Sequence, residues 1–115
     1  HTFAHAIEAA TGYADWLHGE AVGAGLLIAA SMSQRLGALG AQDVARVAAL
    51  LERAGLRSAA PQFGAATAAE FMRIDKKVQA GRVRLVLLKR IGEAHITGDY
   101  ADGALHSTLL EHFGA

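Results

Sequence analysis

Residues 1–20 read HTFAHAIEAATGYADWLHGE, and they predict two helices joined by a short turn, around which the rest of the chain is arranged. On a helix with about 100° per residue, the apolar side chains of the first segment gather on one face. This face comprises Phe3, Ala6, Ile7 and Ala10. His1, His5 and Glu8 gather on the opposite face. Since the apolar face packs, the polar face should point toward solvent or a ligand.

Gly12 is expected to end the first helix, and His18 comes directly before the next one. A short turn would then bring the His18 imidazole back toward His1 and His5. Imidazole is the commonest protein ligand of zinc, and catalytic zinc sites use about three protein ligands. His1 and His18 are therefore candidate metal ligands.

The spacing of the histidines also allows two simpler interpretations. A histidine pair one turn apart on a helix often lies on a solvated face. His1, as the first residue, could also be the remnant of a purification tag or part of a frayed terminus. Spacing alone does not separate these interpretations from a metal site.

The composition fits one globular domain spanning residues 1–115, with 52% hydrophobic and 19% charged residues. Eleven basic residues balance eleven acidic ones, so we expect no nucleic-acid partner, and any anion site must be local. The absence of cysteine excludes disulfides and thiolate metal sites from this sequence. Without a signal peptide, a cytoplasmic location is expected.

The uncharged run over residues 21–32 predicts a helix buried on nearly all sides, with Glu20 in its first turn. Gly23 and Gly25 should allow a neighbouring helix to approach closely. A spanning helix needs about 20 apolar residues, and this run is shorter and rich in glycine, so no membrane association is expected. We therefore expect this segment to be the central core helix.

Two further helices are expected downstream. The first covers residues 42–54 and ends at Gly55. Thr67 and Glu70 match a capping box, which predicts that the next helix begins at Ala68. Its apolar side should carry Phe71, Met72 and Ile74.

Lys76 and Lys77 follow at the end of that helix. Two adjacent lysines are usually solvated surface. The alternative is an anion site, because an ammonium group is a compact charge that can hold a phosphate without bidentate geometry.

Aliphatic and β-branched residues over 82–88 and again over 93–97 predict a small β-hairpin, with a continued helix as the alternative. The basic side chains of this region should form a solvated edge. They are Arg82, Arg84, Lys89 and Arg90. The predicted fold is thus mainly α, with about five helices and a possible small hairpin near residues 82–97.

A final helix is expected to be capped by Asp102. One side of this helix should carry Leu105, Leu109 and Phe113. His95 is expected to be structural or exposed, and His106 and His112 are given no role because they have no partner at ligand spacing.

Four motifs together resemble the C-terminal domain of 3-dehydroquinate synthase and its sugar-phosphate cyclase relatives. They are HTFAHAIE, LHGEAV, DKKV and RLVLL..IG, in the family's order, and the resemblance runs from His1 to about Asp99. It implies that His1 and His18 bind zinc or another divalent metal such as cobalt. It also implies that His5 lies at the substrate and assists proton transfer. A lysine of DKK, either Lys76 or Lys77, would contact the substrate's phosphate.

The resemblance further implies an NAD-dependent carbon–oxygen lyase of the shikimate pathway, which serves aromatic amino acid biosynthesis. The family closes a seven-carbon phosphorylated sugar acid to 3-dehydroquinate, usually as a homodimer. An arginine, an asparagine and a glycine would normally precede His1, and the family's NAD-binding domain and third zinc ligand, a glutamate, also lie upstream. We therefore expect this chain to be a fragment that is inactive alone.

Three alternatives remain open at this point. The first is another NAD- and zinc-dependent sugar-phosphate cyclase, and the second is a non-catalytic helical binding module that kept the motif. The third, an unrelated helical metal-binding protein, would require the DKK and RLVLL matches to be accidental.

Overall fold

The computed structural model describes residues 1–74, 78–79 and 81–115. Within them the chain forms five helices and two antiparallel strand pairs. The helices are α1 (Thr2–Ala10), α2 (His18–Arg35), α3 (Ala41–Arg53), α4 (Ala65–Ile74) and α5 (Asp102–Phe113). The strands are β1 (Val78–Gln79), β2 (Arg82–Val83), β3 (Leu85–Arg90) and β4 (Glu93–Thr97). The predicted mainly-α fold with about five helices is confirmed.

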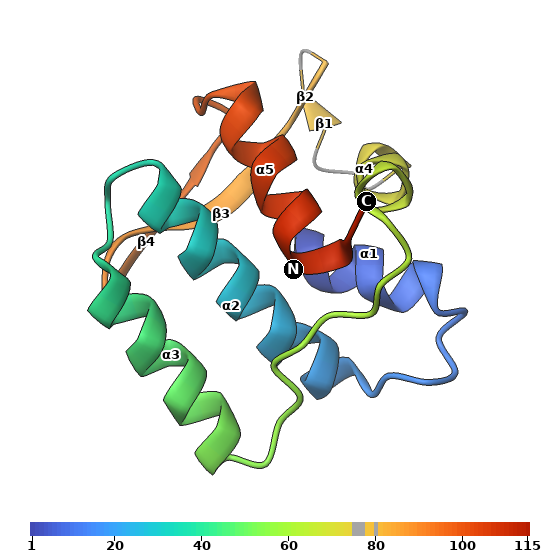
Figure 1. Ribbon diagram of the computed structural model, residues 1–115. Helices are drawn as coiled ribbons and strands as arrows, with labels where there is room; N and C mark the ends of the chain where they lie inside the picture. The colour runs from blue at the N-terminus through green and yellow to red at the C-terminus, as the bar shows by residue number, and fades with distance from the viewer. Residues whose placement is uncertain (75–77, 80) are drawn as a thin grey trace.

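Helix α2 is the central element, as predicted, and it contacts α1, α3, α5 and β3 (Figure 1). Ile28 and Met32 are fully buried on it, whereas Leu26 is 54% exposed. The helix is longer than the uncharged run that predicted it. It begins at His18 because the Glu20 carboxylate accepts the Leu17 backbone N–H at 3.0 Å and so caps its first turn.

Gly23 and Gly25 of α2 allow close packing, as expected. A Cβ at Gly25 would lie 3.1 Å from the backbone nitrogen of Ala4 on α1. A Cβ at Gly23 would lie 3.3 Å from the side-chain ends of Leu51 and Leu56. Helix α1 therefore lies directly on α2, with only hydrogen at the contact point.

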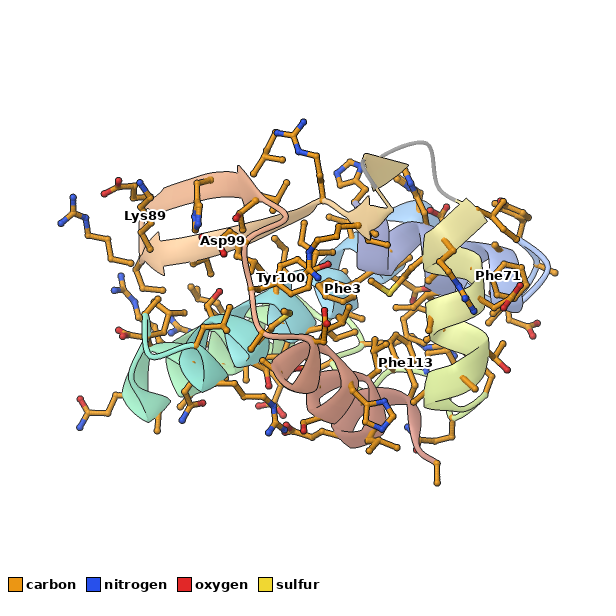
Figure 2. All side chains as sticks on the ribbon, turned by 90° about the horizontal axis from the view of Figure 1, so that it is seen from above. Phe3, Phe71, Lys89, Asp99, Tyr100 and Phe113 are labelled. Carbon is orange, nitrogen blue, oxygen red and sulfur yellow. The ribbon has the colours of Figure 1, made fainter. Side chains whose placement is uncertain are left out.

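The core lies between α1, α2, α4, α5 and β3. Figure 2 shows Phe3, Tyr100 and Phe113 inside the molecule, while Lys89 points outward from the hairpin. Phe113 stacks on Phe63 with 4.9 Å between ring centres. Among the described helices, none combines the length and the apolar character that a bilayer-spanning helix requires.

Strands β3 and β4 form the predicted hairpin, so a continued helix was the wrong alternative. Leu85 and Leu87 are buried, and the Leu88 N–H donates to the Ser33 hydroxyl of α2 at 2.9 Å. The turn uses Gly92 at φ +90°. The short β1–β2 pair was not predicted, because two-residue strands leave no periodic pattern.

The start of α4 differs from the prediction. The helix begins at Ala65, not Ala68, because the Ala65 N–H donates to the Gly114 carbonyl at 2.8 Å and the C-terminal segment caps it. Glu70 instead accepts a hydrogen bond from Arg73 at 2.7 Å. Ile74 is 71% exposed, so it does not belong to the apolar side of the helix.

Two further expectations, for Arg82 and Asp102, were wrong. The Arg82 side chain is 40% exposed, but it is not simply solvated, since its guanidinium donates to the carbonyls of Gly98 and Tyr100 at 2.7 Å each and to the Asp102 carboxylate at 2.8 Å. Asp102 is the first residue of α5, and the N-cap is Ala101, which makes no side-chain cap. The carboxylate of Asp102 thus binds Arg82.

Candidate functional site

The N-terminal ends of α1 and α2 bring three histidines together. The ring centres of His1 and His18 lie 5.4 Å apart, and those of His1 and His5 lie 5.7 Å apart. Both pairs are edge-to-face, with 78° between the ring planes. His1 is the N-cap of α1, and its carbonyl accepts the His5 N–H at 2.7 Å. The predicted return of His18 toward the first helix is confirmed.

The turn between α1 and α2 is closed by local and distant contacts. Gly12 and Tyr13 adopt left-handed conformations at φ +72° and φ +62°. Trp16 is buried, and the Arg57 guanidinium lies 4.3 Å above its ring while donating to the Asp15 carbonyl at 3.3 Å. Arg57 follows α3, so a distant part of the chain fixes the turn that positions His18. No local sequence pattern could have indicated this contact.

Glu8 joins the two helices inside the histidine cluster. Its carboxylate oxygens lie 3.2 and 3.3 Å from Nδ1 of His18. The Glu8 side chain is 14% exposed and that of His18 is 60% exposed. The sequence placed Glu8 on the same face as His1 and His5 but indicated no partner for it, because His18 lies beyond the turn.

The spacing of the imidazoles suits a shared metal ion. With zinc–nitrogen bonds of about 2.0–2.1 Å in tetrahedral geometry, two imidazole rings on one ion have centres roughly 5 Å apart. The 5.4 Å separation of His1 and His18 fits this value. However, within the described ranges no group of three histidine, aspartate or glutamate side chains is arranged to hold a metal ion. The described residues thus supply a compatible pair of ligands and not a complete set.

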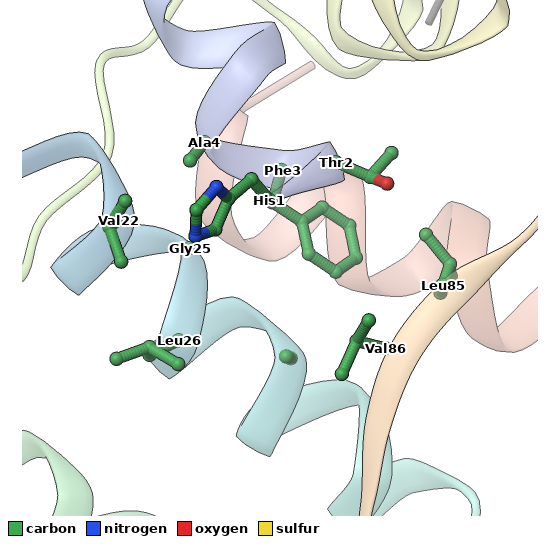
Figure 3. A pocket seen from close by; sticks show the side chains of 10 residues that line it. His1, Thr2, Phe3, Ala4, Val22, Gly25, Leu26, Leu85 and Val86 are labelled. Carbon is green, nitrogen blue, oxygen red and sulfur yellow. The ribbon is translucent and has the colours of Figure 1, made fainter. Parts of the chain in front are cut away.

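A pocket of about 410 Å³ opens beside the histidine cluster. Figure 3 shows the His1 ring next to Val22 and Leu26 of α2, with Leu85 and Val86 of β3 on another side. Its remaining walls are Thr2, Phe3, Ala4, Gly25 and Ala29. The pocket is mainly apolar, and His1 is the member of the histidine cluster that lines it.

The two lysines and the other three histidines are not part of this cluster as the structure describes it. Lys76 and Lys77 lie outside the described residues. His95 is on β4, and His106 and His112 are on α5, whereas the cluster is carried by α1 and α2. The structure therefore unites His1, His5 and His18, adds Glu8 and leaves the lysine prediction untested.

Residues 1–78 match the family described as 3-dehydroquinate synthase C-terminal. The chain is 54% identical over 110 residues to a 3-dehydroquinate synthase of Azotobacter vinelandii, covering 95% of this chain and 30% of the relative. It is 50% identical over 111 residues to one of Halorhodospira halophila, covering 96% of this chain and 31% of the relative. The chain thus spans about a third of the length of these relatives.

A solved structure of 2-deoxy-scyllo-inosose synthase, in complex with carbaglucose-6-phosphate, NAD⁺ and Co²⁺, shares the fold. The TM-score is 0.78 over 97% of this chain and 33% of that chain, at 22% sequence identity. At this identity the similarity concerns the fold alone.

Proposed function

The chain belongs to the 3-dehydroquinate synthase C-terminal family, and on this premise we propose that it is the metal- and substrate-binding part of a 3-dehydroquinate synthase. The reaction of the whole enzyme is the conversion of 3-deoxy-D-arabino-heptulosonate 7-phosphate into 3-dehydroquinate and phosphate. The observation that carries this proposal is the family match over residues 1–78, which includes the three clustered histidines and the DKKV motif.

The proposed metal ligands are His1 and His18, whose ring spacing is compatible with one ion. A bound zinc or cobalt ion would supply Lewis-acid polarisation of a substrate oxygen. His5 is proposed to transfer protons, since an imidazole can accept a proton and an imidazolium can donate one near pH 7. Lys76 or Lys77 is proposed to hold the substrate's phosphate.

The whole enzyme is proposed to use NAD, to form a homodimer and to work in the cytoplasm. These proposals rest on the family resemblance. The relatives that cover nearly all of this chain at about 50% identity carry the name 3-dehydroquinate synthase, which supports this activity over that of another cyclase. A non-catalytic module has no comparable support.

The metal assignment is tested by titrating the chain with zinc in a calorimeter at about pH 8, where a histidine of ordinary pKa is neutral. We expect binding that His18→Ala abolishes or weakens at least tenfold. His106→Ala is the matched control, because this exposed histidine lies on α5 outside the cluster. Equal affinities of the wild-type chain and His18→Ala would disprove the role of His18.

The catalytic proposal is tested in a chimera in which this chain replaces the matching segment of the Azotobacter vinelandii relative. This chimera should form 3-dehydroquinate, whereas the 115-residue chain alone should give no turnover with NAD and substrate. In the chimera, His5→Ala should lower kcat by about 10²- to 10⁴-fold. A well-folded chimera without synthase activity would contradict the proposed function, and an unchanged kcat in His5→Ala would contradict the role of His5.

A further inference from the structure

We propose that Glu8 is a positioning residue, which holds the His18 ring through its Nδ1–H and leaves Nε2 as the nitrogen that can bind metal. This inference rests on the proposed function, because it assigns a partner to one of the proposed metal ligands. Tautomer and zinc-affinity measurements can contradict the positioning role of Glu8 and the metal assignment of His18 separately.

The contact between the two side chains defines which ring nitrogen carries hydrogen. Both Glu8 oxygens lie within 3.3 Å of His18 Nδ1. An ionised carboxylate only accepts hydrogen bonds, so Nδ1 is the donor in this contact. In a neutral imidazole with hydrogen on Nδ1, the lone pair is on Nε2. The contact thus selects the tautomer as well as the orientation of the ring.

Glu8 is the better-anchored member of the pair. Its backbone carbonyl accepts hydrogen bonds from the Tyr13 N–H at 2.9 Å and from the Thr11 hydroxyl at 3.3 Å, which tie the end of α1 to the turn. Its side chain is 14% exposed, whereas His18 is 60% exposed at the first position of α2. A largely exposed ring has few packing contacts, so a hydrogen bond from a fixed carboxylate restricts it most.

Glu8 is inferred to act through His18 and not as a ligand itself. Its carboxylate already faces Nδ1, and among the described residues no third side chain joins it and a histidine in a metal-binding arrangement. A carboxylate on the second nitrogen of a ligating imidazole raises the basicity of the ligating nitrogen and fixes the ring. A solvent-exposed ion pair that does not position a metal ligand would add little to the free energy of folding.

The first measurement is the tautomer of His18, read from the ¹⁵N shifts of its imidazole in the metal-free chain at about pH 8. The wild-type chain should show hydrogen on Nδ1. Glu8→Gln should retain this tautomer, because an amide oxygen still accepts the hydrogen bond. Glu8→Ala should shift the population toward hydrogen on Nε2.

The second measurement is zinc affinity by calorimetry, with thermal unfolding recorded for each variant. Glu8→Ala should weaken binding about 10- to 100-fold, and Glu8→Gln should weaken it less. The matched control is Glu111→Ala, since Glu111 also joins α2 to another helix, through Arg35 at the opposite end of α2. This control should leave zinc affinity unchanged even where it lowers the unfolding temperature.

The outcomes separate the two proposals. If His18→Ala loses zinc but Glu8→Ala binds normally, the positioning role is wrong and the metal assignment stands. If Glu8→Ala changes the tautomer and His18→Ala still binds zinc, the metal assignment is wrong and the contact is confirmed. An unchanged tautomer in a folded Glu8→Ala chain overturns the positioning role whether or not the chain binds zinc.

Discussion

His112 shows how the burial of one side chain couples folding to pH. Burial is the main cause that lowers the pKa of His112 below its ordinary value of 6.5, and Arg35 adds to this effect. The Glu111 carboxylate, 3.9 Å from Nε2, opposes it. Since the unfolded chain binds this proton more readily, the free energy of unfolding contributed by His112 is present above pH 6.5 and is lost as the pH falls below it.

We therefore expect His112→Leu to reduce the acid sensitivity of the fold. Denaturant unfolding at about pH 7.5 and about pH 5 should show a smaller loss of unfolding free energy in the variant than in the wild-type chain. His106→Ala, which alters an exposed histidine on the same helix, should keep the wild-type pH dependence. Identical pH dependence in all three chains would show that His112 is not the coupled group.

At the scale of elements, the site depends on how closely α1 lies on α2. The two helices carry His1, His5 and Glu8 on one side and His18 on the other. The approach is set at Gly25, where an added Cβ would lie 3.1 Å from a backbone atom of α1. Because backbone cannot rotate away as a side chain can, a methyl group there must move one helix relative to the other.

Gly25→Ala and Gly23→Ala form a matched pair for this contact. Alanine favours a helix interior by about 1 kcal/mol over glycine in both variants. At Gly23 the neighbours are the flexible side-chain ends of Leu51 and Leu56, which can move to admit a methyl group, so this variant should keep part of that gain and be at least as stable as the wild type. At Gly25 overpacking should cost about 1–3 kcal/mol and outweigh the gain.

The measurement is denaturant unfolding of both variants, followed by zinc titration. Gly25→Ala should be the less stable and should also bind zinc more weakly, because α1 moves away from His18. If the two variants were equally stable, the contact with the α1 backbone would not limit the packing of the two helices.

At the scale of the whole molecule, the local patterns were sufficient to predict that the five helices exist and which face of α1 is buried. Phe3 and Ile7 are buried on α1 as their spacing predicted, because a helical period is a property of neighbouring residues. The contacts that complete the site were not predictable in this way. Arg57 reaches Trp16 across 41 residues, and its position depends on α3 packing against α2.

Contacts between distant parts of the chain also explain the wrong predictions for Arg82 and for the start of α4. Arg82 resembles any exposed strand residue in sequence, yet its three hydrogen bonds involve residues 98–102, which the chain brings back only after the β3–β4 hairpin. Helix α4 begins early because Gly114, which follows α5 and is distant only along the chain, accepts its first N–H. In both cases tertiary contacts override a local preference.

The described surface carries an apolar patch, which we define as Leu26, Val86 and Ile96. These side chains are 54%, 41% and 59% exposed, respectively. Leu26 and Val86 line the pocket beside His1, and Val86 pairs with Ile96 across β3 and β4. An exposed apolar patch beside a candidate site is typical of a surface that another domain or chain covers.

Because of this patch, we expect Leu26→Lys to improve the behaviour of the isolated chain but to destabilise the chimera. In the 115-residue chain, Leu26→Lys should reduce self-association, seen by light scattering across a concentration series, because a charge replaces exposed apolar surface. In the Azotobacter chimera, the same change should lower the unfolding temperature, since burying an unpaired ammonium group is costly.

Leu50→Lys is the control, because this residue of α3 is 55% exposed but outside the pocket, and it should leave the chimera's unfolding temperature unchanged. Equal self-association of the two variant chains, and equal unfolding temperatures of the two variant chimeras, would show that the patch is ordinary surface that no other domain covers.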